Sequence, residues 1–428
     1  MNASLLARAN GLLRADFFRH GALIFASTTF VNLGNYAFHF YTSRALGVIG
    51  YGALSSLLAM LMLATIPAMV AASTIAKYAA SFSAFRDAPA LRTFGRRVVT
   101  YAGLIATVVC VLGLAASGAL ATYLNLPDTR STVLLTMIAG IQFVSFAARG
   151  VLQGVQDFRR FAVATTSEIF LKLALGVALV STGFGVTGAL LGYAIASVLS
   201  LAYALAVIHR RAGDGPGGPL NIRLGGLIKT TGAIGVSTAA LHSLAFSDLV
   251  LVKHFLDPRL AGLYGALSLV GKTFFFVVSF VPTIVLPKAA DRAARGQSTL
   301  PLLAQAAVAI VSVAGLGLGF VFLFPTFTIA LMAGPAFLAA GPYVLPYASA
   351  MTLLAATNIA VSYRTGLHTF TFVVPLVAIA VGEIVALQFI HRTLGEIVSV
   401  VLVGHAIAFL CVVYRITAVR AVPYTIKA

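Results

Sequence analysis

Long runs of apolar residues, separated by short polar breaks, follow one another along the whole chain. An α-helix needs about 20 apolar residues to cross the hydrocarbon core of a bilayer, and most runs reach that length. They do not alternate apolar and polar residues as barrel strands do, so we expect helices. The sequence predicts twelve spans, at Gly21–Tyr41, Leu54–Ala80, Val98–Leu120, Val133–Phe146, Phe161–Thr182, Val186–Ile208, Leu227–Asp248, Ala261–Val285, Leu302–Leu323, Tyr343–Tyr363, Phe370–Ile390 and Ile397–Tyr414.

The composition leaves little room for a separate soluble domain. Of the 428 residues, 60% are apolar and 9% are charged, and the mean hydropathy is +1.00. The apolar stretch after Arg8, Arg14 and Arg19 runs on to Tyr41, which is too long for the core of a cleavable signal peptide. The sequence therefore predicts an all-α polytopic membrane protein.

Basic residues gather in alternate loops, which predicts the orientation of the chain. With the N-terminus in the cytoplasm, the seven inside segments carry 22 of the 29 Lys and Arg residues when Lys77 and Lys229, at the cytoplasmic ends of their spans, are counted with them, and the outside segments carry five. Cytoplasmic loops of membrane proteins hold such an excess. Both termini are therefore predicted to be cytoplasmic, and the net charge of +18 is mainly a signal of topology. The basic loops face anionic lipid, and we expect no nucleic-acid partner.

A short sequence occurs once in each half of the chain. Tyr51–Ser55, of sequence YGALS, returns unchanged at Tyr264–Ser268, 213 residues further on. Each copy leads towards a proline, Pro67 or Pro282. An even number of spans in each half makes these parallel repeats, an arrangement found in transporters whose cavity lies between two rocking halves.

The repeat predicts the domain organisation. We expect six-helix bundles over residues 1–209 and 227–428. A cytoplasmic linker over residues 210–226 joins them and contains the glycine-rich segment Gly213–Pro219, whose composition is typical of flexible connections.

The sequence shows no motif for a cofactor, a metal or a disulfide framework. Cys110 and Cys411 each lie in the middle of an apolar run, where cysteines usually serve in packing. Val270–Thr273 (VGKT) superficially resembles a phosphate-binding loop, but Ala266 stands where that motif needs a glycine. We therefore expect no ATP site, and transport driven by an ion gradient, the membrane potential or a substrate gradient.

A few charged residues lie inside the predicted spans, where charge usually faces a cavity or a partner helix. Glu168 and Lys172 are four residues apart in the fifth span, so they share a helix face and can neutralise each other. Two interpretations are open. The residues form an ion pair that locks two helices, or they line a cavity and exchange their salt bridges.

The second half of the chain contributes further charges of this kind. Asp248 in the seventh span is a proton or sodium relay, a partner for a cavity base or a helix anchor, and Lys253 follows near the outer surface. Lys272 in the eighth span is a cavity cation or extends to the lipid headgroups. Glu383 in the eleventh span has no base within one turn, so it is partnered from another helix or protonated.

Two arginines stand at the ends of predicted spans. Arg149 ends the fourth span close to Gln153 and two glycines, where it anchors the helix or meets an anionic substrate at the cytoplasmic mouth. Arg44 is the basic residue of the first outside turn, and a gate role is one interpretation of that position.

Several short motifs, rich in small residues, are spread over nearly the whole chain. They are Ser43–Gly47 with Gly50–Gly52, Gly150–Phe158, Glu168 to Lys172 with Gly183–Ala189, and Ser247–Asp248 followed by Ala261–Tyr264. Together they resemble the polysaccharide-transporter branch of the multidrug/oligosaccharidyl-lipid/polysaccharide exporter (MOP) superfamily.

The resemblance implies a two-lobed flippase of the bacterial inner membrane. Its substrate would be an undecaprenyl-pyrophosphate-linked oligosaccharide, the repeat unit of an O-antigen, a capsule or an exopolysaccharide, moved from the cytoplasmic to the outer face. Other polysaccharide-assembly proteins are expected partners. The chain has fewer predicted spans than the fuller lipid II flippases, so the additional pair that forms a lipid-tail groove in those proteins is not assumed.

The resemblance also implies a cationic cavity and a recurrent acid in the seventh span, which here is Asp248. The candidates for substrate binding are Arg44, Arg149, Lys172 and Lys272. The candidates for ion coupling or salt bridges are Glu168, Asp248, Lys253 and Glu383.

Physical requirements separate this interpretation from its rivals. A pyrophosphate-sugar head cannot cross hydrocarbon unaided, and a cavity with a few buried cations, open sideways to lipid, would carry it. An ion-coupled drug antiporter of the same superfamily should have an acidic cavity, but the intramembrane acids do not clearly outnumber the bases. A glycosyltransferase or O-antigen polymerase usually needs a large outside loop with catalytic residues, so we expect no enzyme. A non-transporting component of a polysaccharide-synthesis system is the third alternative.

Overall fold

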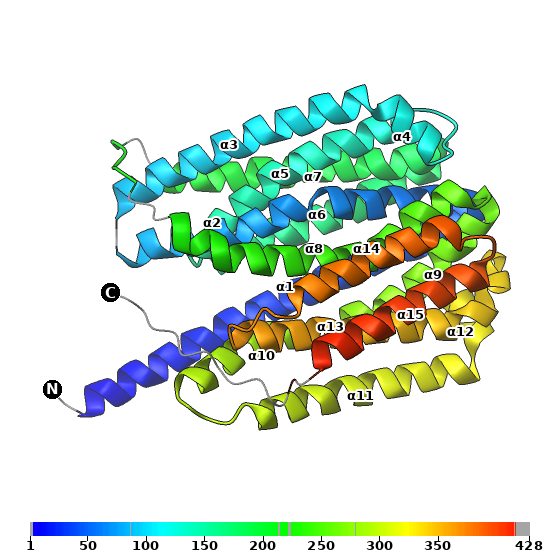
Figure 1. Ribbon diagram of the computed structural model, residues 1–428. Coiled ribbons are helices and arrows are strands. Elements are labelled where there is room, and N and C mark those ends of the chain that lie inside the picture. Colours follow the sequence, from blue (N-terminus) through cyan, green and yellow to red (C-terminus); the bar gives the residue numbers. More distant parts are fainter. Residues whose placement is uncertain are drawn as a thin grey trace. The chain divides into compact units, whose positions relative to one another are not determined.

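The computed structural model describes residues 3–85, 87–212, 215–220, 224–278, 280–414 and 416, and the regular secondary structure in these ranges is helical (Figure 1). Residues 213, 214 and 221–223 of the expected linker, and the C-terminal end from residue 417 onward, lie outside the described residues. The elements are α1 (Ala3–Ala64), α2 (Ile66–Ala84), α3 (Ala88–Ala115), α4 (Ser117–Tyr123), α5 (Arg130–Gly154), α6 (Phe158–Leu179), the π-helix η1 (Val180–Phe184), α7 (Gly185–Ala212), α8 (Leu224–Phe255), α9 (Pro258–Val277), α10 (Phe280–Ala294), α11 (Leu300–Leu323), α12 (Pro325–Met332), the 3₁₀-helix η2 (Pro335–Ala340), α13 (Gly341–Gly366), α14 (Val373–Phe389) and α15 (Leu394–Val413).

The helices follow the predicted apolar runs, and glycines break two of the longest stretches. Gly47 takes a φ of 65° and a ψ of −173°, so α1 consists of two helical segments that meet at this residue. Gly183 and Gly185 have φ angles of 92° and 55° between α6 and α7. A side chain at any of these positions would be strained, because L-residues with a Cβ atom rarely adopt positive φ.

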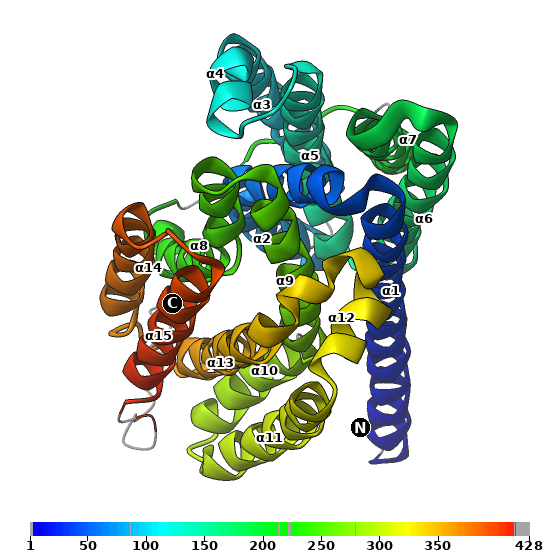
Figure 2. The ribbon, with the colours of Figure 1, turned by 90° about the vertical axis from the view of Figure 1, so that its right-hand side faces the viewer.

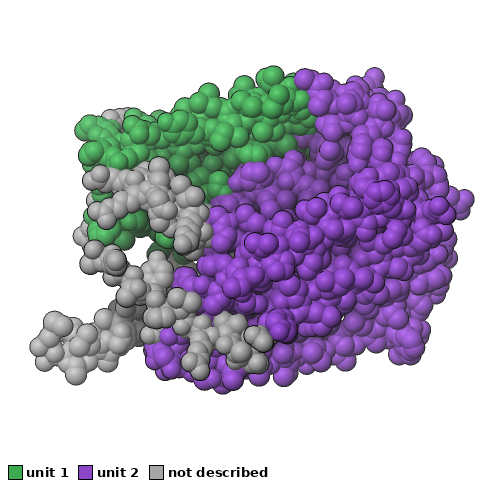
Figure 3. Space-filling view, in the orientation of Figure 1, with its two compact units in different colours: residues 1–38, 71–114, 136–222 green, residues 39–70, 115–135, 223–428 purple. Residues whose placement is uncertain are grey.

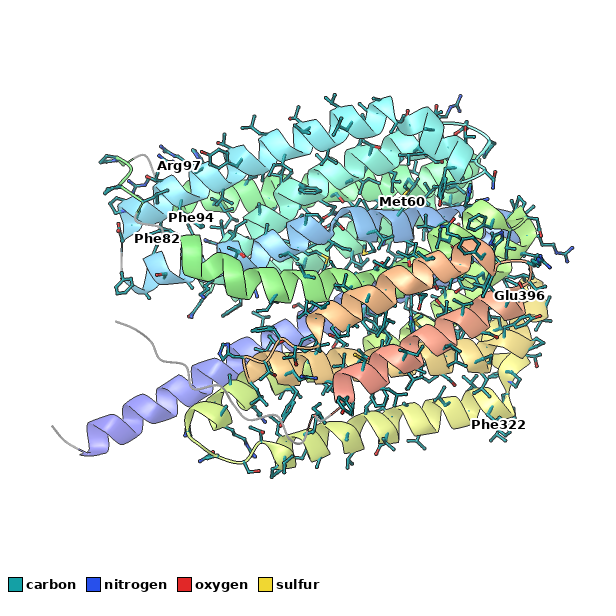
Figure 4. The ribbon with its side chains drawn as sticks, in the orientation of Figure 1. Met60, Phe82, Phe94, Arg97, Phe322 and Glu396 are labelled. Carbon is teal, nitrogen blue, oxygen red and sulfur yellow. The ribbon has the colours of Figure 1, made fainter. Side chains whose placement is uncertain are left out.

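Nine helical stretches of the described chain are long and apolar enough to cross a membrane by length and composition, and the 17-residue α14 is a shorter apolar helix. Two of the nine, Ala26–Ala64 and Phe158–Arg211, contain the glycine breaks. Large apolar side chains stay exposed on the outer helix faces. Leu316 is 80% exposed, and Phe322, which is labelled on α11 in Figure 4, is 68% exposed. In a bilayer such faces meet lipid tails that are equally apolar.

The chain forms two compact units, which Figure 3 shows in different colours. Unit 1 comprises Met1–Phe38, Ala71–Leu114 and Thr136–Ile222, and unit 2 comprises His39–Val70, Ala115–Leu135 and Arg223–Ala428. Unit 2 therefore combines the second half of the sequence with two segments from the first half. The expected division into bundles over residues 1–209 and 227–428 stays a prediction.

In unit 1, α6 and α7 run side by side in close contact (Figure 2). A methyl group added at Gly192 of α7 would lie 2.6 Å from the backbone nitrogen of Gly176 in α6. Gly150 of α5 approaches α2 in the same way, because an added methyl would lie 2.7 Å from the carbonyl oxygen of Ala72. Small residues allow membrane helices to approach this closely and to gain van der Waals contacts. These contacts fix the helices that carry the charged residues of unit 1.

In unit 2, α13 packs against α9, α10 and α15, and α14 packs against α8 and α15. The helices carry large aromatic side chains into the interior, and Tyr347 and Tyr363 of α13 are 0% and 1% exposed. Figure 2 shows α8, α14 and α15 grouped beside α13. This group of helices holds the buried charges of unit 2.

The two copies of YGALS pack against each other within unit 2. Tyr51 and Tyr264, the first residues of the copies, are 1% and 0% exposed. A methyl group added at Gly52 would lie 2.7 Å from the Cα of Gly262, just before the second copy, so α1 and α9 touch through their backbones here. The repeated sequence thus marks a contact between helices from the two halves of the chain.

The local structure after each copy is repeated as well. The helix that carries the first copy ends at Ala64, and the next helix contains Pro67. The helix that carries the second copy ends at Val277, and the next helix contains Pro282. A proline lacks the backbone N–H that a continuous helix needs, which explains why both helices are interrupted here.

Replacement of Gly262 by valine is expected to destabilise the protein, because the new side chain would collide with the backbone of Val48. Overpacking of this kind costs about 1–3 kcal/mol. The melting temperature of the purified protein in detergent measures the effect. Gly103→Val is the matched control, because nothing lies within 4 Å of a methyl group added there. Equal melting temperatures for the two variants would contradict the close contact.

Candidate functional site

The charges predicted inside the membrane form two buried groups, one in each unit. The group in unit 1 is built from α1, α5, α6 and α7, and the group in unit 2 from α8, α9, α13, α14 and α15. The exposed fractions of Glu168, Lys172, Asp248 and Glu383 do not exceed 6%. Charges buried to this extent need partners that replace the lost water.

Glu168 of α6 is the centre of a polar network in unit 1. Its Oε1 accepts hydrogen bonds from Gln142 at 2.6 Å and Ser197 at 2.9 Å, and its Oε2 forms a salt bridge with Arg149. Arg149 also donates to the hydroxyl of Ser200 at 3.2 Å. The carboxylate therefore joins α5, α6 and α7, and it offsets the charge of Arg149.

Lys172 of α6 has partners of a different kind. Its Nζ donates to the side-chain oxygen of Asn35 at 2.9 Å, and it lies 4.5 Å and 4.6 Å from the ring centroids of Phe38 and Tyr193. The ring faces attract the ammonium through their quadrupoles. Among the described side chains, no carboxylate lies within salt-bridge distance of Lys172.

The first interpretation, an ion pair between Glu168 and Lys172, is therefore wrong, and the second, a cavity lined by both residues, stays a prediction. Both oxygens of Glu168 are occupied by donors from α5 and α7, and the lysine is directed to α1. Spacing places two residues on one helix face, but neighbouring helices decide which partner each residue finds. Lys172 is therefore a buried cation whose partners are an amide and two aromatic rings, and not an anion.

Asp248 of α8 is fully buried and links three helices of unit 2. Its Oδ2 accepts hydrogen bonds from the hydroxyls of Tyr264 at 2.8 Å and Tyr347 at 2.7 Å. Its Oδ1 accepts the backbone N–H of Leu249 at 2.8 Å. Tyr264 is the first residue of the second YGALS copy, so the repeat also positions a hydrogen-bond donor to this carboxylate.

Two lysines of this half are also buried in unit 2. Lys272 lies on α9, and Lys253 lies on α8, the helix that carries Asp248. Lys272 of α9 is 8% exposed, and its Nζ lies 4.2 Å from the ring centroid of Phe246. It interacts electrostatically with Asp248. Lys253 is 2% exposed near the end of α8, and its carbonyl oxygen accepts a hydrogen bond from Asn125 at 3.3 Å.

Glu383 of α14 lies beside a histidine of another helix, and the choice between a partnered and a protonated carboxyl stays a prediction. The Nε2 of His405 in α15 lies 3.6 Å from its Oε2, and both side chains are 0% exposed. Neither carboxylate oxygen has a hydrogen-bond partner among the described residues. The remaining contacts of His405 are to backbone carbonyls of α13 and α8.

Arg44 binds the end of a helix. Its guanidinium donates to the carbonyl oxygens of Ala330 at 3.2 Å, Leu331 at 2.8 Å and Met332 at 3.3 Å, in the last turn of α12. The carbonyl groups in the last turn of a helix receive no hydrogen bond from within the helix. The guanidinium donates hydrogen bonds to them, and its positive charge complements the helix dipole.

A second helix end in unit 2 is satisfied in a similar way. Asn125 donates to the carbonyl oxygens of Lys253 at 3.3 Å and His254 at 2.9 Å, in the last turn of α8. The ring of His254 stacks on Tyr123 with centroids 3.9 Å apart. Arg44 and Asn125 both come from the first half of the sequence, and the helices that they cap come from the second half.

Sequence reasoning missed several polar residues that complete these groups. Asn35, Gln142, Tyr193, Tyr347 and His405 lie in apolar runs where single polar residues are common. Their burial together with a charged residue is a property of the folded chain, and no spacing along the sequence signals it. The groups nevertheless suggest distinct chemistry. Lys172 can attract an anion, whereas the acids and the histidine of unit 2 can hold a proton or a small cation.

The family described as "Polysaccharide biosynthesis protein" matches residues 17–287, which is more than half of the chain. No curated protein sequence matches.

Comparison with solved structures shows the fold. An inward-facing multidrug resistance MATE family transporter of the MOP superfamily matches with a TM-score of 0.72 at 15% identity, over 91% of this chain and 95% of the other. The lipid II flippase MurJ, in an inward closed conformation, matches with a TM-score of 0.68 at 10% identity, over 94% of this chain and 87% of the other. The MATE multidrug transporter DinF-BH matches with a TM-score of 0.59 at 15% identity, over 94% of this chain and 96% of the other. The chain has the fold of these transporters and is a multi-pass membrane protein.

Removal of Glu168 is expected to destabilise the protein, because Arg149 would remain buried without its counter-charge. Breaking a buried ion pair in this way costs about 3–5 kcal/mol, whereas removing both charges costs much less. We expect Glu168→Ala to lower the melting temperature and Glu168→Gln with Arg149→Met to restore most of the loss. Asp291→Ala is the control, because its pair with Arg295 is exposed and contributes little. A double variant as unstable as Glu168→Ala would contradict the assignment.

Proposed function

Because the chain belongs to the polysaccharide biosynthesis protein family, we propose that it is a flippase for a polyprenyl-pyrophosphate-linked oligosaccharide. The substrate is the repeat unit of an O-antigen, a capsule or an exopolysaccharide, carried across the bacterial inner membrane by alternating access. The fold shared with MATE transporters and MurJ supports a transport role. Other polysaccharide-assembly proteins and membrane lipids are the proposed partners, and the proposal includes no enzymatic step and no cofactor.

The proposed topology has twelve spans with both termini in the cytoplasm. The distribution of Lys and Arg supports this orientation, since 22 of the 29 fall in the inside segments or at the cytoplasmic ends of the adjoining spans. The breaks at Gly47 and Gly183 support the count, because each divides a long helical stretch into two segments. In the proposed organisation, residues 1–209 and 227–428 form the two rocking halves, and residues 210–226 connect them.

The observation that carries the proposal is the environment of Lys172. Its ammonium is buried inside a membrane bundle and is held by Asn35 and two aromatic rings. A cation without an anionic partner is costly in such a place, so we infer that an anion of the substrate completes the site. A pyrophosphate offers several acceptor oxygens for charge-assisted hydrogen bonds.

In the proposal, the other three cations either contact the head group of the substrate or form a gate. Lys272, which also lies over an aromatic ring, and Arg149, beside the network of Glu168, are further candidates for contact with the head of the substrate. The polyprenyl tail stays in lipid while the head moves. Arg44 is assigned to a gate rather than to the head group, because its guanidinium already donates to the end of α12.

Ion coupling belongs to unit 2 in this proposal. Asp248 and Glu383 are buried acids on α8 and α14, and Lys253 lies further along α8. These same acids support the alternative of an ion-coupled drug or small-molecule antiporter. The fold shared with a MATE transporter supports this alternative as well. A membrane component of polysaccharide synthesis that does not itself transport is the third alternative for the test to decide.

Replacement of Lys172 by alanine is expected to reduce export of the lipid-linked oligosaccharide by roughly 10–100-fold, because a hydrogen bond to a charged group contributes about 1.5–3 kcal/mol. The measurement is complementation of cells that lack the protein, at matched membrane abundance. The undelivered lipid-linked sugar should accumulate on the cytoplasmic face. Lys288→Ala is the control, because Lys288 is an exposed lysine of α10.

Stability measurements separate loss of binding from loss of folding. Lys172 has no carboxylate partner among the described residues, so its removal leaves no opposite charge unpaired, and the melting temperature should fall by less than that of Glu168→Ala. Full export by Lys172→Ala would contradict the proposed role of this lysine.

An inside-negative membrane potential is expected to favour outward movement of the anionic head, by about 2.3 kcal/mol per charge per 100 mV. The purified protein in vesicles, with a fluorescent polyprenyl-pyrophosphate-linked disaccharide as probe, allows the potential to be set with a potassium gradient and valinomycin. Flipping should become faster as the interior becomes more negative. An unchanged rate with the potential collapsed and no ion gradient would contradict this prediction.

A further inference from the structure

The ring of His405 lies between two backbone carbonyl oxygens. Its Nδ1 is 3.0 Å from the carbonyl oxygen of Ala350 in α13, and its Nε2 is 3.1 Å from the carbonyl oxygen of Leu244 in α8. A carbonyl oxygen only accepts hydrogen bonds, so each nitrogen must donate. A neutral imidazole has one N–H group, and its other nitrogen would direct a lone pair at an oxygen. Only the imidazolium, with two N–H groups, satisfies both contacts.

The charge of such a ring requires an anion nearby, and Glu383 supplies it. Its Oε2 lies 3.6 Å from the Nε2 of His405, and both side chains are 0% exposed. The two carboxylate oxygens have no hydrogen-bond partner among the described residues, so the imidazolium is the group that offsets the charge of Glu383. Gly404 makes room for the pair, because a side chain there would collide with the Glu383 carboxylate.

The neighbouring charged and titratable groups are already engaged. Asp248 of α8 interacts electrostatically with Glu383 and His405, but its oxygens accept hydrogen bonds from Tyr264 of α9 and Tyr347 of α13. Lys272 of α9 lies over Phe246 and interacts with Asp248. These groups set the field around the pair, whereas Glu383 and His405 are the groups whose contacts change when a proton leaves.

We propose that Glu383 and His405 form a proton-binding site that holds helices α8, α13, α14 and α15 together. The site binds one exchangeable proton, which it takes from water and returns to water. When the proton leaves His405, the carboxylate of Glu383 remains buried without a counter-charge, and one ring nitrogen faces a carbonyl oxygen with its lone pair. Both conflicts are relieved when α15 moves away from α8 and α13. Protonation and helix packing are thereby linked.

A role for this proton in export rests on the proposed function. In a flippase, release of the proton and separation of the helices would link the movement of the substrate to a proton gradient. The proton site itself does not depend on that role, and it can be tested without any substrate.

The decisive measurement is the protonation state of His405 in the full chain, by solid-state NMR of the protein in lipid vesicles at about pH 7.5. Of the eight histidines, His405 alone follows a glycine, so labelling with carbonyl-¹³C glycine and ¹⁵N histidine selects its signal without a variant. We expect two protonated ring nitrogens for His405. An unprotonated nitrogen in His405 at this pH would overturn the proposal.

A Glu383→Gln variant adds a second readout, with Asp291→Asn as an exposed control. We expect Glu383→Gln to leave His405 neutral at the same pH and to abolish the dependence of flipping of the fluorescent disaccharide probe on the pH gradient. Flipping that keeps its full dependence on the gradient in Glu383→Gln would overturn the coupling role. If His405 is an imidazolium and the protein flips no probe, the proposed function is refuted and the proton site stands. If His405 is neutral and the protein flips the probe, the proton site is refuted and the proposed function stands.

Discussion

A charge inside a hydrocarbon-embedded helix bundle must find its partner within the protein, and the polar structure of this chain follows from that constraint. Glu168 satisfies it with Arg149 and two neutral donors, and Asp248 satisfies it with two tyrosine hydroxyls. Lys172 and Glu383 satisfy it only in part. The lysine has an amide and aromatic rings, and the carboxylate has a histidine that is charged only when protonated. The incomplete sites are the ones to which we assign function.

Contacts between the two halves of the sequence in unit 2 also supply partners for polar groups and bring backbones together. Arg44 and Asn125 satisfy the terminal carbonyls of α12 and α8, and the backbones at Gly52 and Gly262 touch. If the halves separate during transport, these carbonyls must find water, and the packing of the glycines is lost. In the proposed transport cycle, these contacts would stabilise one state by an amount that the substrate or a proton must offset.

The helical class of the chain was predicted from its apolar runs, because these respond to a single requirement, the thickness of the bilayer, while the count of twelve spans stays a prediction. The charges inside the predicted spans were expected to face a cavity or a partner helix, and in the structure Asp248 and Glu383 are buried. Partners were predicted poorly. The spacing of Glu168 and Lys172 indicated a pair, but each residue bonds to a different helix. His405 gave no signal at all, because the carbonyls and the carboxylate that define its role come from α8, α13 and α14. Spacing along one helix shows which residues share a helix face. Which helix packs against that face is decided only in the folded bundle.

The central claim is that the substrate is an anionic lipid-linked sugar, and competition between two probes in the same vesicles tests it most directly. The purified protein would be reconstituted with a fluorescent polyprenyl-pyrophosphate-linked disaccharide in the presence or absence of a cationic dye. The account predicts that the protein moves the lipid-linked disaccharide between leaflets, and that an excess of the dye does not slow it. Transport of the dye, with the disaccharide left in its original leaflet, would contradict the account and identify a drug antiporter.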